Sequence, residues 1–253
     1  MQPSKRMNKK ITTTLSLVTV LTGISHAATF SPIAATGWNY DVVIGAGEDT
    51  SGRTGTMDDG PGGGRATWYG IGYNTDEPTT GLPTGLTTSQ TLVDGVDTVE
   101  FQLQDFTQNN AILDSGTLSF NGSFSRLALF GSTGDGPADM NITVNYEDGT
   151  NQFFSNLGGS GINHDWYGDG DVAYIARGRI EVDLAQIQPS VDNPRLFQTI
   201  LDLNSTANVT SVVIASLGSG HNAVMAVSGV AVPEPSTLLL GFLGLTSLLI
   251  RRR

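Results

Sequence analysis

From residue 28 to about residue 232, short runs of alternating apolar and polar residues are separated by Gly, Asp, Asn and Pro. Residues 140–146 alternate in this way, and Asp148 and Gly149 then form a pair typical of a hairpin turn before a return strand from residue 152. A period of two predicts β-strands, and no long run has the 3.6-residue period of an amphipathic helix. Further strands are predicted at residues 39–44, 67–73, 98–103, 124–130, 173–183, 196–203, 210–216 and 223–232.

About ten strands in roughly 200 residues favour an all-β fold. We expect a two-sheet antiparallel jelly-roll sandwich over residues 28–232, flanked by an N-terminal signal helix and a short C-terminal transmembrane helix. Residues 45–64 are rich in Gly and Asp and predict a surface loop, and residues 183–187 predict a brief helical turn.

The N-terminus has the pattern of a secretory signal peptide at residues 1–27. Four basic residues precede an apolar run over residues 11–24, and Ser25 and Ala27 then supply small side chains at the −3 and −1 positions. We expect cleavage after Ala27, with Ala28 as the near alternative. An uncleaved membrane anchor is the other interpretation, although the apolar run is short and broken by Thr and Ser.

The C-terminus, residues 233–253, combines Pro233, Glu234 and Pro235 with an apolar stretch at residues 237–250 and a basic end. A helix of this length spans about 21 Å, which is less than a hydrocarbon core of about 30 Å. The basic end is Arg251, Arg252 and Arg253, which the positive-inside rule places in the cytoplasm. The rest of the chain then faces the other side of the membrane, in agreement with the signal peptide.

These three elements, in this order, resemble the PEP-CTERM sorting signal of Gram-negative bacteria. The resemblance implies recognition by a membrane-embedded exosortase, cleavage near Pro233-Glu234-Pro235, and delivery from an inner-membrane intermediate to the cell surface or extracellular matrix. The two prolines keep the segment extended, as a processing enzyme requires. A plain tail anchor is the alternative.

The formal net charge of −11 is unevenly distributed. Residues 28–232 contain six Arg and no Lys, and the chain contains no Cys. The missing side chains exclude a P-loop, Schiff-base chemistry and thiolate metal sites. A body this acidic repels nucleic acid, so we expect no nucleic-acid partner.

Residues 124–230 resemble C-terminal β-sandwich modules of secreted bacterial carbohydrate-active proteins. The segments that carry this resemblance are residues 126–129, 146–150, 165–168, 193–196 and 209–214. The resemblance implies a jelly-roll fold and either sugar binding or packing against a neighbouring domain.

Two candidate sites lie in one Gly-rich stretch. Asp165, Asp169 and Asp171 are hard oxygen ligands suited to a structural Ca²⁺ ion, although Asp and Gly also form ordinary turns. Trp166 and Tyr167 are candidates for stacking on a sugar ring, and the alternative is that they pack the core. Weaker candidates are, for the metal, Asp58, Asp59, Asp135 and Asp139, and for the sugar, Trp68, Tyr69 and Tyr73.

Catalytic motifs are absent from the sequence. His164 and His221 are the histidines that remain after signal-peptide removal, and no nucleophile elbow accompanies them. We therefore expect a non-enzymatic surface or matrix protein that meets extracellular polysaccharide. A carbohydrate-binding protein is the first alternative, and a glycoside hydrolase, which needs a pair of facing carboxylates, is the second.

Overall fold

The computed structural model describes residues 27–62, 65–92, 95–155, 161–169, 172–188 and 193–232. The two predicted terminal helices, the sorting residues from Pro233 onward and the candidate ligand Asp171 lie outside these ranges. Within them, no helix is long and apolar enough to cross a membrane.

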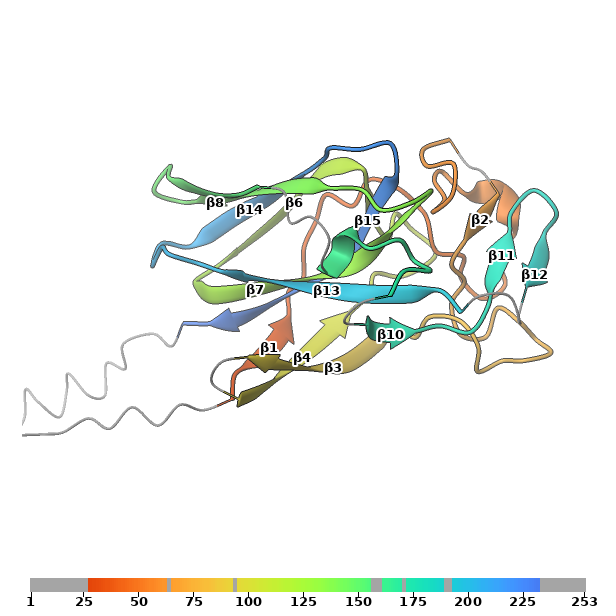
Figure 1. The fold of residues 1–253 in the computed structure, drawn as a ribbon, viewed down its shortest axis with the longest axis horizontal. Helices are drawn as coiled ribbons and strands as arrows, with labels where there is room; N and C mark the ends of the chain where they lie inside the picture. Colours follow the sequence, from red (N-terminus) through yellow and green to blue (C-terminus); the bar gives the residue numbers. More distant parts are fainter. Residues whose placement is uncertain are drawn as a thin grey trace, which may run out of the picture.

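The largest sheet combines strands from both halves of the chain (Figure 1). Its order is β10 (Val172–Ile175), β13 (Arg195–Asp202), β7 (Phe124–Gly134), β15 (His221–Ala231), β1 (Thr29–Pro32), β4 (Gly95–Gln102) and β3 (Gly85–Leu92), and β5 (Ile112–Leu113) also pairs with β15. The β1–β4 pair is parallel, whereas the other pairs in this sheet are antiparallel. The sheet is therefore mixed. The prediction of a purely antiparallel sandwich is wrong for this sheet.

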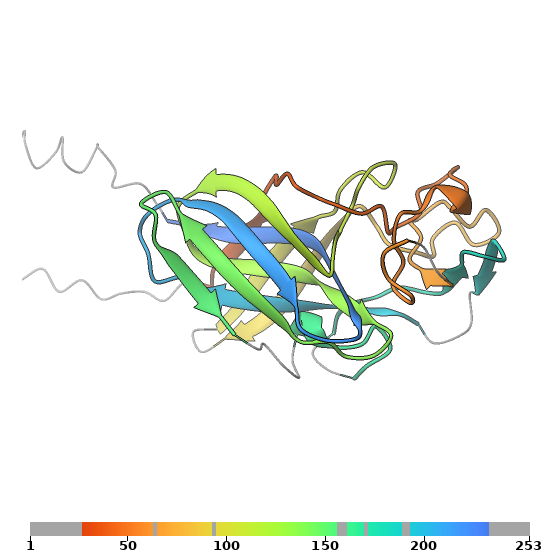
Figure 2. The ribbon, with the colours of Figure 1, turned by 90° about the horizontal axis from the view of Figure 1, so that it is seen from above.

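A second, four-stranded sheet covers one face of the first (Figures 1 and 2). Its order is β6 (Ser115–Gly122), β14 (Val209–Ser216), β8 (Met140–Tyr146) and β9 (Asn151–Phe154). The Asp148-Gly149 turn joins β8 to β9 as predicted, with Gly149 at a φ of 82°. The all-β sandwich is thus confirmed.

A third sheet, which the sequence did not predict, lies at one end of the sandwich (Figure 2). It consists of β12 (Gln186–Gln188), β11 (Arg179–Glu181) and β2 (Ala66–Thr67), with the short 3₁₀ turn η1 (Thr50–Gly52) nearby in the chain. We call residues 40–84 and 176–188 the end lobe. A second 3₁₀ turn, η2 (Gly161–Asn163), lies against the sandwich strands β7 and β13.

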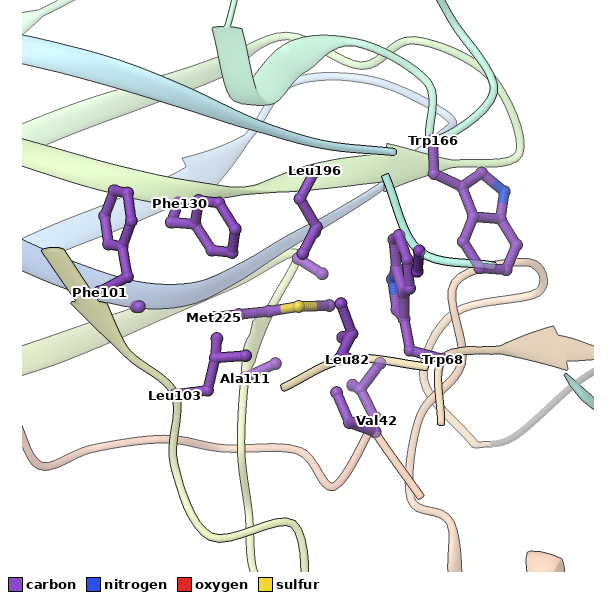
Figure 3. Packing of buried hydrophobic residues seen from close by; sticks show 14 of the residues in the cluster. Val42, Trp68, Leu82, Phe101, Leu103, Ala111, Phe130, Trp166, Leu196 and Met225 are labelled. Atoms are coloured by element: carbon purple, nitrogen blue, oxygen red, sulfur yellow. The ribbon is translucent and has the colours of Figure 1, made fainter. Parts of the chain in front are cut away.

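The central strands of the largest sheet are buried on both faces, which explains their nearly continuous apolar sequence. On β7, Leu127 and Leu129 face the core between the two large sheets, which we call the inter-sheet core. Ala128 and Phe130 face the opposite way, into a second core that the end lobe and β4 cover. Figure 3 shows Phe130 and Phe101 stacked in this second core, beside Met225.

The largest sheet also curls toward itself. The Thr88 hydroxyl on β3 donates a hydrogen bond of 2.6 Å to Gln198 Oε1 on β13, although these strands are far apart in the strand order. Both side chains are buried. The curl places β3 and β4 over the second core and closes it.

Several predicted elements differ from the observed ones. Residues 39–44 form isolated bridges at Tyr40 and Ile44 in place of a regular strand. The run at 173–183 is broken at Gly178, which has a φ of 81°, so that β10 and β11 enter different sheets. Residues 183–185 belong to the turn between β11 and β12, and not to a helical turn. Strands β1, β3, β5, β6 and β12 were not predicted.

Candidate ligand-binding groove

Two neighbouring hollows are lined by the loop between β4 and β5. The first lies where this loop meets the end lobe, and the second lies between this loop and residues 35–38. The first has a volume of about 630 Å³ and the second about 370 Å³, and both are lined by Gln104 and Asp105. The first is also lined by Gly45, Ala46, Ile71, Leu82, Pro83, Thr84, Gln102, Leu103, Phe106 and Thr107. The second is also lined by Ala35, Thr36, Gly37, Trp38, Gln108 and Asn109. We call the pair the groove.

The shared wall of the groove is a tight turn capped by its own carboxylate. Asp105 Oδ1 accepts hydrogen bonds of 2.9 Å from both the backbone N–H and the hydroxyl of Thr107. The Gln108 N–H donates to the Asp105 carbonyl at 3.2 Å. The Thr107 hydrogen bonds lower the pKa of the Asp105 carboxyl, so that it is ionised at neutral pH and accepts hydrogen bonds.

Phe106 anchors this turn to the end lobe. Its side chain is buried and belongs to the second core. A Cβ atom added to Gly70 would lie 2.5 Å from the Phe106 ring, so glycine is required at this close approach. The polar residues on either side of Phe106 therefore stay at the surface, where they line the groove.

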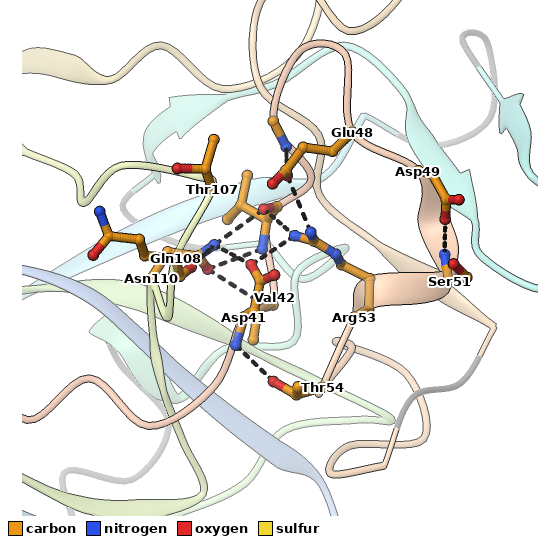
Figure 4. A network of polar contacts seen from close by, with 12 residues as sticks. Asp41, Val42, Glu48, Asp49, Ser51, Arg53, Thr54, Thr107, Gln108 and Asn110 are labelled. Carbon is orange, nitrogen blue, oxygen red and sulfur yellow. Dashed lines mark hydrogen bonds and ion pairs between the residues drawn. The ribbon is translucent and has the colours of Figure 1, made fainter.

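Asn110 holds the end lobe against the same turn (Figure 4). Its Oδ1 accepts hydrogen bonds of 2.9 Å from the N–H groups of both Val42 and Val43. Its Nδ2 donates to Asp41 Oδ1 at 2.7 Å and to the Val43 carbonyl at 3.0 Å. One buried side-chain amide thus makes the hydrogen bonds to the backbone that a neighbouring strand would make in a sheet. This explains why residues 39–44 are not regularly paired.

Arg53 completes this polar network. One guanidinium nitrogen lies 2.6 Å from Asp41 Oδ1 and 2.7 Å from the Val43 carbonyl, and the other lies 3.0 Å from Glu48 Oε2. Only 4% of the Arg53 side chain is exposed. Glu48 Oε2 also accepts a hydrogen bond of 2.7 Å from the Gly45 N–H, so the network fixes a wall of the first hollow.

Asp41 has the most perturbed environment in this network. Burial raises the pKa of its carboxyl to about 6, against the opposing effect of the Arg53 guanidinium. The nearby Glu48 carboxylate raises this pKa further because two like charges share one guanidinium. The network is therefore sensitive to pH in the range where surface carboxylates are already ionised.

Trp38 forms part of the second hollow. Its indole N–H donates a hydrogen bond of 3.0 Å to the Ala35 carbonyl, which fixes the orientation of the ring. The ring is partly buried against the inter-sheet core. Asn109 Nδ2 donates to the Trp38 carbonyl at 3.3 Å and connects this segment to the capped turn.

Two of the three aspartates predicted to bind metal, Asp165 and Asp169, lie within the described residues and have separate roles. Asp165 accepts backbone hydrogen bonds from Gly136 at 2.9 Å and from Tyr167 at 2.8 Å. Asp169 is fully exposed and lies 3.5 Å from Arg195. Within the described ranges, no group of three or more His, Asp or Glu side chains is placed to hold a metal ion. Because Asp171 lies outside the described residues, a structural Ca²⁺ ion stays a prediction.

The two aromatic residues predicted to bind sugar lie outside the groove. Trp166 is 1% exposed and packs edge-to-face on Trp68, with ring centroids 5.3 Å apart (Figure 3). Its ring fills the second core, as in the alternative weighed from the sequence. Tyr167 is half-buried, with the Arg179 guanidinium 5.5 Å from its ring centroid.

The two histidines are also remote from the groove lining. The His164 ring packs against Phe197, with centroids 5.0 Å apart. His221 Nδ1 lies 3.1 Å from Asp114, and its Nε2 lies 3.8 Å from Asp135. A Cβ atom added to Gly60 would clash with the His221 ring at 2.1 Å, so the imidazole is enclosed by backbone on that side.

The comparison with protein families identifies a sorting signal at the C-terminus. Residues 231–253 match the PEP-CTERM protein-sorting motif. This motif indicates that an exosortase sorts the protein to the cell surface, as the sequence predicted. A search of curated proteins found no match to the chain.

Sequence reasoning missed the groove. The signal that points to it is the amide-rich segment at residues 102–110, which contains three Gln and two Asn around a single carboxylate. Amides attract less attention than aromatic or charged residues because they are ordinary loop residues. Nothing in the sequence pairs this segment with Trp38, since the contact depends on how the loops fold.

Proposed function

We propose that this exported surface protein is non-enzymatic and binds an uncharged extracellular polysaccharide in the groove. The observation that carries the proposal is that Gln104 and Asp105 line both hollows. Two neighbouring hollows that share these side chains suit an extended chain better than a single small molecule.

The lining has the chemistry that a sugar chain requires. Amide side chains both donate and accept hydrogen bonds, as sugar hydroxyls do, and the groove presents Gln102, Gln104, Gln108 and Asn109. The Trp38 indole offers apolar surface for the C–H face of a sugar ring. The net charge of −11 disfavours anionic polymers and so favours a neutral polysaccharide.

The proposal of a non-enzymatic protein rests on the carboxylates. Among the described residues that line the groove, Asp105 is the one acidic side chain. Glycoside hydrolysis uses two carboxyl groups, one of them with a raised pKa. Hydrogen bonds lower the pKa of Asp105, which suits a fixed hydrogen-bond acceptor and not a general acid.

We also infer that the sandwich is a jelly roll. In its support, the order β5-β15-β7-β13 in one layer faces β6-β14-β8-β9 in the other. Along the chain these strands alternate between the layers, except for the β8–β9 hairpin. This alternation is the pattern of interleaved Greek keys.

The route of export is part of the same proposal. A signal peptidase cleaves after Ala27, and the tail holds the precursor in the inner membrane of a Gram-negative bacterium. Exosortase then cleaves near Pro233-Glu234-Pro235 and releases the domain toward the matrix. The basic residues Arg251, Arg252 and Arg253 stay on the cytoplasmic side.

Binding of the mature protein to the polysaccharide that its host secretes tests the groove. We expect Q104A and Q108A together to weaken binding at least about tenfold, because each loses direct hydrogen bonds to the sugar. Q186A, at an exposed position on β12, is the matched control and leaves binding unchanged. Equal binding by the double variant and the wild type in affinity electrophoresis contradicts the proposal, as does the absence of binding by the wild type.

A further inference from the structure

The residue that follows the predicted cleavage point is fixed by both of its backbone groups. The Ala28 nitrogen lies 2.7 Å from Asp97 Oδ1, and the Ala28 carbonyl accepts a hydrogen bond of 3.0 Å from the Thr98 N–H. Ala28 is half-buried, whereas Ala27 is exposed. The ordered contact thus begins at the first residue of the predicted mature chain.

Asp97 is a buried carboxylate, and each of its two oxygens contacts a different partner. Its side chain is 4% exposed. Oδ2 lies 2.8 Å from an Arg126 guanidinium nitrogen, and Oδ1 is the atom that accepts from Ala28. Arg126 is itself held in place, with its guanidinium 5.1 Å from the centroid of the Phe30 ring.

Strand β1 begins immediately after this contact and joins two parts of the largest sheet. Thr29 pairs with Thr98 on β4, and Ser31 pairs with Gly229 on β15. On the path from β15 to the β4–β3 hairpin, β1 is the connecting strand. A contact that fixes the start of β1 therefore also stabilises the closure of the second core, where Phe30 is buried.

We propose that Asp97 is the binding site for the α-ammonium group that signal-peptide removal creates at Ala28. This inference rests on the proposed export route, and specifically on cleavage after Ala27. The signal peptidase hydrolyses the bond between the Ala27 carbonyl carbon and the Ala28 nitrogen with one water molecule. Ala27 leaves with a carboxylate on the released peptide, and the Ala28 amine holds a second and third hydrogen as an ammonium group at neutral pH.

The geometry favours an ammonium group at this position. In the precursor the Ala28 nitrogen has one N–H and no charge, whereas an ammonium group has three donors and a full positive charge. The separation of 2.7 Å joins a peptide N–H to the carboxylate, and an ammonium group at the same place would add a positive charge and two further donors. Cleavage one residue later would remove Ala28 and leave Oδ1 without this donor, so the contact supports cleavage between Ala27 and Ala28 over the alternative point.

The composition of the chain allows a specific test. Residues 28–253 contain no Lys, so the α-amine is the one amine in the mature protein. An amine-reactive ester therefore reports on this group alone. We expect mass spectrometry to find Ala28 as the first residue of the exported protein, and the wild-type amine to react at least about tenfold more slowly than the amine of D97N.

Chemical modification separates the charge from the N–H group. Acetylation of the unfolded protein removes the positive charge but keeps one N–H, and we expect the refolded product to melt about 4 °C or more below the wild type. Reductive methylation keeps the charge and is the matched control, with a smaller shift. This pair tests the proposal even where D97N does not fold.

The outcomes distinguish this inference from the export route. An exported chain that begins at Ala28 but whose amine reacts as fast as that of an unfolded peptide overturns the Asp97 site and leaves the export route standing. A chain that begins at another residue overturns both the Asp97 site and cleavage after Ala27. Equal melting temperatures of acetylated and methylated proteins also overturn the proposed ion pair.

Discussion

Strand β7 of the sandwich runs over eleven residues and pairs with β13 and β15, whereas β2 of the end lobe spans two residues. In the sandwich, ladder hydrogen bonds satisfy the backbone and apolar side chains fill both sides of the central strands. In the end lobe, the side chains of Asn110 and Arg53 satisfy backbone groups of Val42 and Val43. A chain with little regular pairing is thus ordered by a buried polar network.

The sandwich and the end lobe are in close backbone contact where β7 ends. A Cβ atom added to Gly134, at the end of β7, would lie 2.0 Å from the Met57 carbonyl oxygen of the end lobe. Met57 itself is buried in the second core. The end lobe therefore contributes to the apolar interior of the sandwich, while its outer loops line the groove together with the β4–β5 loop and residues 35–38.

The largest expected effect is on the sandwich. Phe130 is fully buried and stacks on Phe101 at a centroid distance of 4.4 Å. We expect F130A to lower the free energy of unfolding by about 3–5 kcal/mol, because it removes buried apolar area and leaves a cavity. Urea unfolding measures this change.

The matched control is Phe153 on β9, which is 57% exposed. F153A removes the same side chain from the surface, and we expect a change within about 0.5 kcal/mol. Similar losses in the two variants would contradict the burial of Phe130 in the second core.

A smaller and local effect is expected in the end lobe. R53M removes the guanidinium and leaves the carboxylates of Asp41 and Glu48 without their shared partner, a loss of about 3 kcal/mol for a broken buried ion pair. We expect hydrogen exchange of the Val42 and Val43 amides to accelerate about 100-fold. Hydrogen exchange of the Leu129 amide on β7 should accelerate much less, because the sandwich strands remain paired.

Arg177 supplies the control for this variant. Its side chain is 62% exposed and lies 3.4 Å from Glu77, so the pair is screened by solvent. We expect R177A to leave exchange in both regions nearly unchanged. Equal acceleration in the end lobe and in β7 for R53M would show that the network stabilises the whole domain and not the end lobe alone.

The same contrast explains what could be predicted from the sequence. Strand β8 was predicted at its observed bounds, because residues 140–146 alternate regularly and a Gly149 turn follows. Strands β3 and β6 were missed because Thr, Ser and Gly occupy many of their positions, which hides the alternation of burial. Their pairing is decided by neighbours that are distant in sequence, such as β14 for β6.

The candidate site was less predictable for a related reason. Trp166 and Tyr167 attracted attention as aromatic residues beside acids, but Trp166 is buried against Trp68, which is 98 positions away in the chain. The groove depends on surface amides that carry no distinctive pattern. The sorting motif, in contrast, is one continuous stretch of sequence, so it could be identified without knowledge of the fold.

The smallest effect concerns how stability depends on pH through two carboxylates with opposite pKa shifts, Asp41 and Asp105. Burial raises the pKa of Asp41 to about 6 from its ordinary value of 3.8. Between these values the folded state holds a proton that the unfolded state has lost, so the contribution of Asp41 to stability falls as the pH rises from about 4 to about 6. We expect D41N to remove this fall, and urea unfolding of both proteins across this range measures the difference.

Asp105 provides the opposite sign in the same buffers. Its pKa is lowered by the Thr107 hydrogen bonds, so its contribution is present above the ordinary pKa of a carboxyl group and is lost as the pH falls through the lowered value. D105N should therefore differ from the wild type mainly at neutral pH, and D41N should show its change between pH 4 and 6. A wild-type protein that gains stability relative to D41N as the pH rises through this window would mean that the Arg53 ion pair, and not burial, dominates at Asp41.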